Sequence, residues 1–259
     1  MSSKINQLLN KWPSGTVALQ SWFSEQGVTR QLAREYRNTN WLTHVGHGAY
    51  IRANDNVDWK GAVFALQRHA NLQIWPGGQT ALSLQGYAHY LPMHRETVFL
   101  FATPRTRLPA WVKQYDWGVQ LRFRPINLFA TDNSNQVNEI DQAAAKFGDF
   151  NIKISSLERA TFELLSLVSD KSSFINAAEM IEGLLNLRPA VMEAYLKVCK
   201  SVKVTRLLLF LAEHYQHAWL EKINRDCANL GSGKRQVVKN GILNKKYRIT
   251  VPREFQYGH

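Results

Sequence analysis

The chain has 259 residues, of which 45% are hydrophobic and 11% aromatic, so it can form a sizeable core and wholesale disorder is excluded. Its formal net charge of +12 points to a polyanionic partner: nucleic acid, an anionic membrane surface or an acidic protein. The longest apolar run, Leu207 to Ala212, is too short to cross a bilayer, and the N-terminus lacks the apolar segment of a signal peptide. We therefore expect a cytoplasmic protein that has no membrane contact.

The N-terminal part of the chain has the pattern of a small helical domain. Apolar spacing predicts a first helix at 4–11, and Thr16 is expected to cap a second helix. Thr29 is expected to cap a third helix, and residues 41–52 predict two short strands joined at glycines. Three helices followed by a hairpin are the layout of a winged helix-turn-helix, which we expect at residues 1–52.

The third predicted helix has a polar face suited to DNA. An α-helix fits the major groove, where arginine can bridge guanine and glutamine can bridge adenine. The alternative is an ordinary solvated face of a winged helix that binds protein. The polar side chains of this helix face are Arg30, Gln31, Arg34 and Arg37.

The remaining chain predicts a larger C-terminal region, residues 53–259, with subdomains possible at 53–152 and 153–259. The first of these parts mixes helices and strands, and the second consists of helices followed by a hairpin that turns at Asn240-Gly241. Ser155 and Glu158 have the spacing of a capping box at the start of the helical part. The expected fold class is α+β and predominantly helical. Helices are predicted at 59–69, 79–90, 110–115, from 155, and at 174–186, 189–200 and 203–217, and strands at 96–102 and 118–124.

Positive charge is concentrated at both ends of the chain. Residues 1–52 have six Lys or Arg against two acids, and residues 151–259 have seventeen against ten, while the segment between them is close to neutral. A solvated helix face and solubilising lysines on an edge strand are the alternatives to a binding role. The expected basic C-terminal surface consists of Lys197, Lys200, Lys203, Arg206, Lys234, Arg235, Lys245, Lys246 and Arg248.

Patterns typical of catalysis are weak in this sequence. Gly231-Ser232-Gly233-Lys234 resembles a phosphate-binding loop, but Ala228 stands where the leading glycine is needed and Arg235 where Ser or Thr would bind magnesium. His214 and His217 have a spacing that metal ligands use, without a third ligand at matching spacing. We expect no catalytic residue, no metal and no cofactor.

Several segments in order along the chain resemble the AbiEi family of antitoxins from bacterial type IV toxin–antitoxin systems. None of these segments is a catalytic signature, but together they cover nearly the whole chain. They are WLTHVGHGAYIR (41–52), WKGA (59–62), TALSLQG (80–86), SLERA (156–160), GLLNLRP (183–189), LGSGKR (230–235) and KKYRITVP (245–252).

The resemblance implies two roles. The winged helix would repress the protein's own operon by binding inverted repeats in double-stranded operator DNA, as a dimer or as cooperating monomers. The C-terminal region would neutralise a nucleotidyltransferase-like toxin, a role that need not involve a stable complex. The implied DNA contacts are Thr29, Arg30, Gln31, Arg34 and Arg37 in the helix, and His47, Tyr50 and Arg52 in the wing.

Two rival interpretations remain open. One is a DNA-binding transcriptional regulator whose C-terminal region senses a ligand or self-assembles, without a toxin partner. A large apolar pocket with converging polar groups would favour it. The other is a nucleic-acid-processing enzyme tethered by a winged helix, which clustered carboxylates or histidines with perturbed pKa values in a cleft would favour.

Overall fold

The computed structural model describes residues 3–87, 95–130 and 142–255, and its fold is mixed α+β. The chain divides into two compact units. Unit 1 comprises Met1–Pro76, Pro92–Ile126 and Ala144–Ile154, and unit 2 comprises Gly77–Leu91, Asn127–Ala143 and Ser155–His259. The boundary expected between residues 52 and 53 falls inside unit 1.

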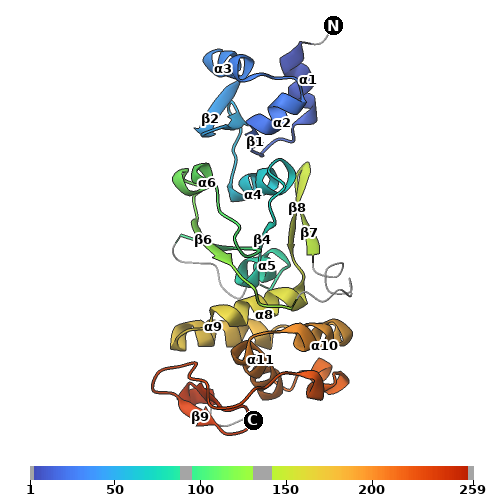
Figure 1. Cartoon of the computed structure of the whole chain (residues 1–259), viewed down its shortest axis with the longest axis vertical. Coiled ribbons are helices and arrows are strands. Elements are labelled where there is room, and N and C mark those ends of the chain that lie inside the picture. Colours follow the sequence, from blue (N-terminus) through green and yellow to red (C-terminus); the bar gives the residue numbers. More distant parts are fainter. Residues whose placement is uncertain (1–2, 88–94, 131–141, 256–259) are drawn as a thin grey trace. The chain divides into compact units, whose positions relative to one another are not determined.

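The first part of unit 1 combines three helices with a small antiparallel sheet (Figure 1). The strand order is β1-β3-β2, with β3 in the centre. The helices predicted at 4–11 and after Thr29 are confirmed, as is the hairpin within 41–52. The elements are α1 (Lys4–Lys11), β1 (Ala18–Leu19), α2 (Gln20–Glu25), α3 (Arg30–Asn38), β2 (Leu42–Gly46) and β3 (Ala49–Arg52).

The prediction that Thr16 caps the second helix is wrong. Its hydroxyl donates to Pro13 O at 2.7 Å and accepts from Trp12 Nε1 at 2.9 Å, which occupies the oxygen that a cap would use. The chain after Thr16 is extended because β1 pairs with β3, and α2 begins only at Gln20. A pairing partner some thirty residues further along the chain therefore overrides the local helix signal.

An aromatic core holds these elements together. Trp12 and Phe23 are almost fully buried, and their rings meet edge to face with centroids 5.5 Å apart. Ala33 of α3 and Leu42 of β2 are buried in the same cluster. This core fixes which side of α3 is turned inward.

The second part of unit 1 is built around a three-stranded sheet of order β4-β5-β6. β4 pairs antiparallel with β5, and β5 pairs parallel with β6 through a crossover that contains α6. Period-two alternation correctly predicted β6, whereas the β7–β8 sheet was not predicted, although β8 alternates apolar and polar residues in the same way. The elements are α4 (Trp59–Arg68), β4 (Ile74–Pro76), β5 (Thr97–Ala102), α6 (Ala110–Gln114), β6 (Gln120–Pro125), β7 (Gln142–Phe147) and β8 (Phe150–Ser155).

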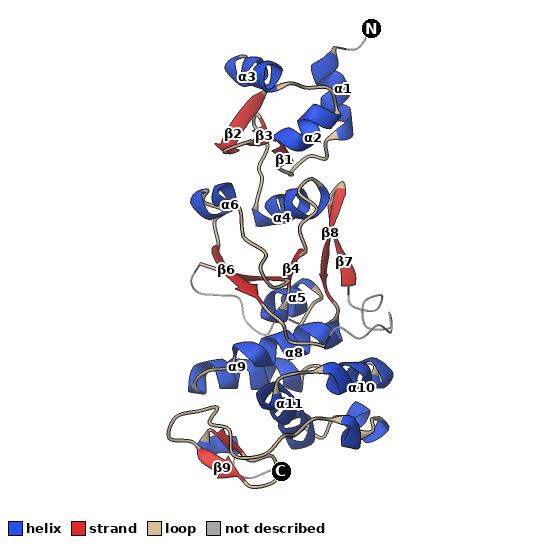
Figure 2. Ribbon diagram, viewed as in Figure 1, coloured by secondary structure: helices blue, strands red, loops and turns tan. Residues whose placement is uncertain are grey.

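Unit 2 is mainly helical, with α8 at its centre (Figure 2). α8 packs against α5, α9, α10 and α11, and a short two-stranded sheet follows near the end of the described chain. The helices expected in this part are confirmed with shifted ends, and residues 88–90 of the helix predicted at 79–90 lie outside the described residues. The elements are α5 (Gly78–Leu84), α8 (Leu157–Leu167), α9 (Lys171–Glu182), α10 (Pro189–Val198), α11 (Val202–His214), the 3-10 turns η1 (Ala218–Lys222), η2 (Arg225–Cys227) and η3 (Arg253–Phe255), and the strands β9 (Ile242–Asn244) and β10 (Ile249–Val251).

Two local predictions in unit 2 are wrong. The C-terminal hairpin turns at residues 245–248 rather than at Asn240-Gly241, because Asn244 pairs with Ile249 and Ile242 with Val251. Gly241 lies instead against the Val251 carbonyl, where a Cβ would be only 2.5 Å from the oxygen. The cap of α8 is Ser156, and Glu158 does not close a capping box. Its carboxylate binds the Arg188 guanidinium instead, at 2.7 Å, and this contact lowers the pKa of Glu158 against the effect of burial.

No helix in the described parts of the chain is long and apolar enough to cross a membrane.

Candidate nucleic-acid interface

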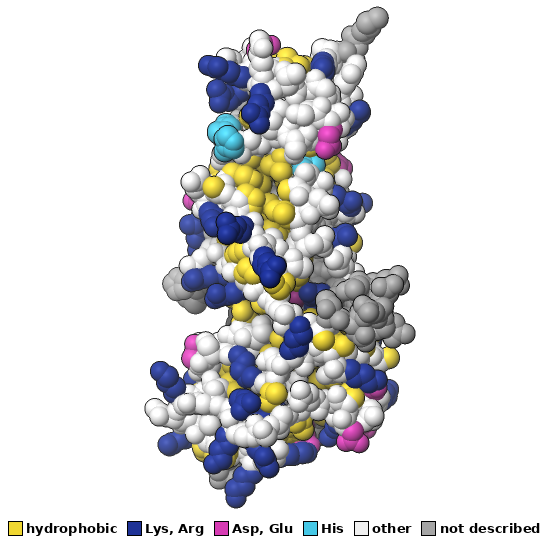
Figure 3. Space-filling view, in the orientation of Figure 1, with side chains coloured by type: hydrophobic (Ala, Val, Ile, Leu, Met, Phe, Trp, Pro, Cys, Tyr) yellow, Lys and Arg dark blue, Asp and Glu magenta, His cyan; other side chains and the backbone are white. Residues whose placement is uncertain are grey.

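The exposed face of α3 is the first candidate interface. Thr29 caps the helix by accepting a hydrogen bond from Leu32 N at 3.2 Å, and Ala33 is fully buried on the inner side. Arg30 and Arg34 are one helical turn apart, so their side chains are neighbours, and both are exposed. Figure 3 shows Lys and Arg side chains gathered over this helix. Gln31 and Arg37 are exposed as well.

This face has a further polar residue that was not predicted. Asn38 is exposed and follows Arg34 by one helical turn, so it extends the row of donors along α3. Its signal in the sequence was obscured because Asn38-Thr39-Asn40 reads as a helix terminator. Glu35 is the single acid within α3, so the helix keeps a net positive charge.

The β2–β3 hairpin only partly matches the predicted wing contacts. His47 is exposed at the turn, where Gly48 has a φ of +66°. Tyr50 is half buried, and its ring stacks on Phe23 with centroids 5.3 Å apart. Two exposed side chains of β2, Thr43 and His44, were not predicted; they are consecutive, so alternation along the strand could not have indicated both.

Arg52 does not extend from the wing as expected. Its Nη2 donates a 2.6 Å hydrogen bond to Leu9 O, and its guanidinium lies 5.6 Å from the centre of the Trp12 ring. The physical reason is that Leu9 O, near the end of α1, accepts only a long 3.4 Å bond from Trp12 N, so a guanidinium beside it gains both a hydrogen bond and an aromatic contact. Arg52 therefore fastens α1 to the sheet.

Of the four cations expected between residues 197 and 206, the three lysines bind other groups of the protein. Lys197 is exposed and pairs with Glu193 one helical turn away, and this hydrogen bond raises the pKa of the Lys197 amine. Lys200 Nζ donates to Asn127 Oδ1 at 2.8 Å. Lys203 is half buried; its Nζ donates to the carbonyls of Ser166 and Val168 at the end of α8, and burial lowers its pKa. Spacing alone placed these lysines on a common surface, because it does not show which of them bind other groups of the protein.

Arg206 is not a surface residue, which corrects its placement in the basic C-terminal surface. Only 2% of it is exposed. Its Nε donates to Leu230 O and its Nη1 to Gly233 O, both at 2.7 Å, and its Nη2 donates to Gly231 O at 3.2 Å. Burial lowers its pKa, and the positive charges of two other arginines add to that effect. Carbonyl oxygens replace water around the buried guanidinium, which makes this position tolerable for a cation.

The cations around the C-terminal sheet are exposed, as expected. They lie on the loop that Arg206 binds and on the β9–β10 turn. Within the described residues, Lys246 forms an ion pair with Glu213. The glycine-rich loop shows no phosphate-loop arrangement, because its carbonyls are directed at Arg206. The exposed members of the set are Lys234, Arg235, Lys245, Lys246 and Arg248.

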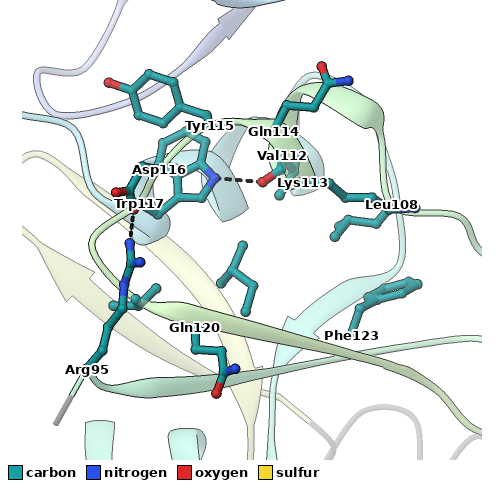
Figure 4. A pocket seen from close by; sticks show the side chains of 12 residues that line it. Arg95, Leu108, Val112, Lys113, Gln114, Tyr115, Asp116, Trp117, Gln120 and Phe123 are labelled. Carbon is teal, nitrogen blue, oxygen red and sulfur yellow. Dashed lines mark hydrogen bonds and ion pairs between the residues drawn. The ribbon is translucent and has the colours of Figure 1, made fainter.

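Unit 1 also contains a cavity of about 790 Å³ between α6 and β6 (Figure 4). Apolar side chains from both elements line it, including Val112 and Phe123, and Trp117 is held by a 2.8 Å hydrogen bond from its Nε1 to Val112 O. The described residues contain no group of three His, Cys, Asp or Glu that could hold a metal ion. Of the predicted metal-spaced pair, His214 packs on Phe210 and His217 faces Ile181 O at 2.9 Å.

Two family models together match nearly the whole chain. The model described as "Transcriptional regulator, AbiEi antitoxin N-terminal domain" matches residues 1–93, and that described as "Transcriptional regulator, AbiEi antitoxin, Type IV TA system" matches residues 95–252. The crystal structure of the RV2827C protein from Mycobacterium tuberculosis has a similar fold, with a TM-score of 0.60 and 15% identity over 95% of this chain and 89% of that chain. No curated protein matches the chain. The chain thus belongs to the AbiEi family of antitoxins and transcriptional regulators of type IV toxin–antitoxin systems.

Proposed function

We propose that this protein is a cytoplasmic antitoxin that also represses its own operon by binding inverted repeats in the promoter. In this proposal, residues 1–52 form a winged helix-turn-helix in which α3 enters the major groove and the β2–β3 hairpin is the wing. The order α1-β1-α2-α3-β2-β3 supports this assignment. The C-terminal region neutralises a nucleotidyltransferase-like toxin, and its exposed cations provide a second anion-facing surface.

The observation that carries the proposal is that α3 has one buried side and one exposed polar side. Ala33 anchors one side in the core, while Arg30, Gln31 and Arg34 are exposed on the other. Arginine and glutamine are the side chains that read guanine and adenine through paired hydrogen bonds. Within the described residues neither the Arg30 nor the Arg34 guanidinium has a hydrogen bond or an ion pair, and both side chains are exposed, which leaves them available to DNA.

The double variant Arg30→Ala, Arg34→Ala tests the DNA role. We expect its affinity for the promoter repeats to fall at least about thirtyfold, because two charged contacts of roughly 1–3 kcal/mol each are lost. Neutralisation of the toxin, measured by co-expression and growth, should persist. The matched control Arg105→Ala, Arg107→Ala removes two exposed arginines from a loop of the same unit and should leave affinity nearly unchanged.

Two results would count against the proposal. Equal losses of affinity in the two double variants would mean that α3 makes no privileged contact. Simultaneous loss of operator binding and neutralisation, in a variant with native circular dichroism, would contradict separate surfaces for the two roles.

A further inference from the structure

One edge of β6 has no partner strand among the residues that the structure describes, since the sheet order is β4-β5-β6. Gln120 N donates to Glu96 O at 2.8 Å and Ile126 N donates to Ala102 O at 3.0 Å, so the even-numbered residues point their backbone groups toward β5. Backbone groups alternate in direction along a strand. The N–H and C=O groups of Leu121 and Phe123 therefore face the open edge.

The two faces of β6 differ in chemistry. The register pairs Leu121 with Val98 and Phe123 with Leu100, so these side chains share one face of the sheet. On that face Leu121 and Phe123 are only half buried, and both line the cavity beneath α6 that Figure 4 shows. An added strand could place apolar side chains there.

The other face of β6 is basic. Arg122 and Arg124 are exposed on it, and no acidic residue pairs with either within the described chain. At the cavity rim, Lys113 is exposed, while Arg95 forms an ion pair with Asp116. An occupant with carboxylates at alternate positions would complement this charge.

We propose that the open edge of β6 binds an extended acidic segment of a partner protein as an additional strand. The peptide backbone would bond to Leu121 and Phe123, its apolar side chains would enter the cavity, and its carboxylates would lie beside Arg122 and Arg124. Strand addition of this kind draws affinity from main-chain hydrogen bonds and specificity from alternate side chains. A second copy of this chain is disfavoured because it would bring like arginines together across the new strand pair.

The test uses the full-length protein and a blocked peptide of alternating glutamate and valine, about seven residues long to match a strand. Titration calorimetry should detect binding, and hydrogen exchange should show the amides of Leu121 and Phe123 protected at least about tenfold on peptide addition. The same peptide with N-methyl groups on its strand-facing amides should bind at least about tenfold more weakly, because those hydrogen bonds are lost. This comparison needs no protein variant.

Charge reversal provides the matched comparison. Arg122→Glu with Arg124→Glu should weaken peptide binding at least about tenfold, whereas Arg105→Glu with Arg107→Glu should change it less than about threefold. The proposal is overturned by the absence of binding at millimolar peptide, or by binding that leaves the two amides unprotected, as expected of a ligand held in the cavity alone. It is also overturned if the first pair of changes weakens operator DNA binding and not peptide binding, since β6 would then be a DNA surface.

Discussion

The guanidinium of Arg206 donates a 2.7 Å hydrogen bond to the carbonyl oxygen of Gly233. This contact, with those to Leu230 and Gly231, ties α11 to the glycine-rich loop that carries Lys234 and Arg235. Arg206 is a buried cation that positions exposed cations, so its effect on any partner of this surface is indirect.

Replacing Arg206 by Met should lower the free energy of unfolding by about 2–4 kcal/mol, because four backbone carbonyl groups each lose a donor. Urea unfolding followed by fluorescence measures this change. Arg206→Lys should recover part of the loss, since an ammonium group can serve some of the carbonyls. If the Met variant were as stable as the wild type, the loop would not depend on this cation.

Arg52→Met should lower the free energy of unfolding and leave the affinity for operator DNA nearly unchanged. The variant keeps the apolar stem but loses the hydrogen bond to Leu9 O and the stacking on Trp12, a loss of about 1–2 kcal/mol. At a temperature where it is fully folded, its operator affinity should stay within about threefold of the wild type. A tenfold weaker affinity in the folded variant would identify Arg52 as a direct DNA contact.

His69 makes the protein sensitive to mild acid. Its ring stacks on Trp22 with centroids 4.9 Å apart, and burial lowers its pKa from 6.5 to about 4. Between these two values the unfolded chain binds a proton that the folded chain does not, so stability falls as pH decreases through this window. Over this window, His69 lowers the free energy of unfolding by at most about 3 kcal/mol.

The variant His69→Phe keeps an aromatic ring against Trp22 and cannot be protonated. Its unfolding free energy should decline less steeply than that of the wild type between pH 6.5 and about 4, and the two should run parallel above pH 7. Unfolding curves in urea at a series of pH values provide the measurement. Identical slopes in the acidic window would show that another group controls the acid response.

Operator binding should depend strongly on salt. If Arg30, Arg34 and Arg37 each release one condensed counterion, whether they contact a base or a phosphate, affinity should fall at least about thirtyfold between 50 and 200 mM salt. In Arg30→Ala, Arg34→Ala, the slope of log affinity against log salt should decrease by roughly two. Fluorescence anisotropy with labelled promoter DNA tests both statements, and a wild-type affinity that does not change with salt would contradict them.

Local pattern was sufficient to predict α3 and its exposed face. Helical periodicity and a single cap act over a few residues, so Thr29 and Ala33 could be assigned without knowledge of the rest of the chain. The same holds for β6, whose alternation of polar and apolar residues is visible in order along the chain. The short segments that resemble the AbiEi family are likewise recognisable from the sequence without any knowledge of contacts.

Contacts between distant segments determine the features that local pattern did not predict. Thr16 fails as a cap because β3 offers a strand partner, and Arg52 turns inward because the end of α1 supplies a carbonyl. Arg206 has the spacing of an exposed lysine series, yet its carbonyl ligands come from residues 230–248, which no helical period can reveal. Local pattern was enough to predict most helical segments and the basic face of α3. Which cations are free to meet a partner is known only from tertiary contacts, because burial of a charge depends on donors and acceptors that folding brings together.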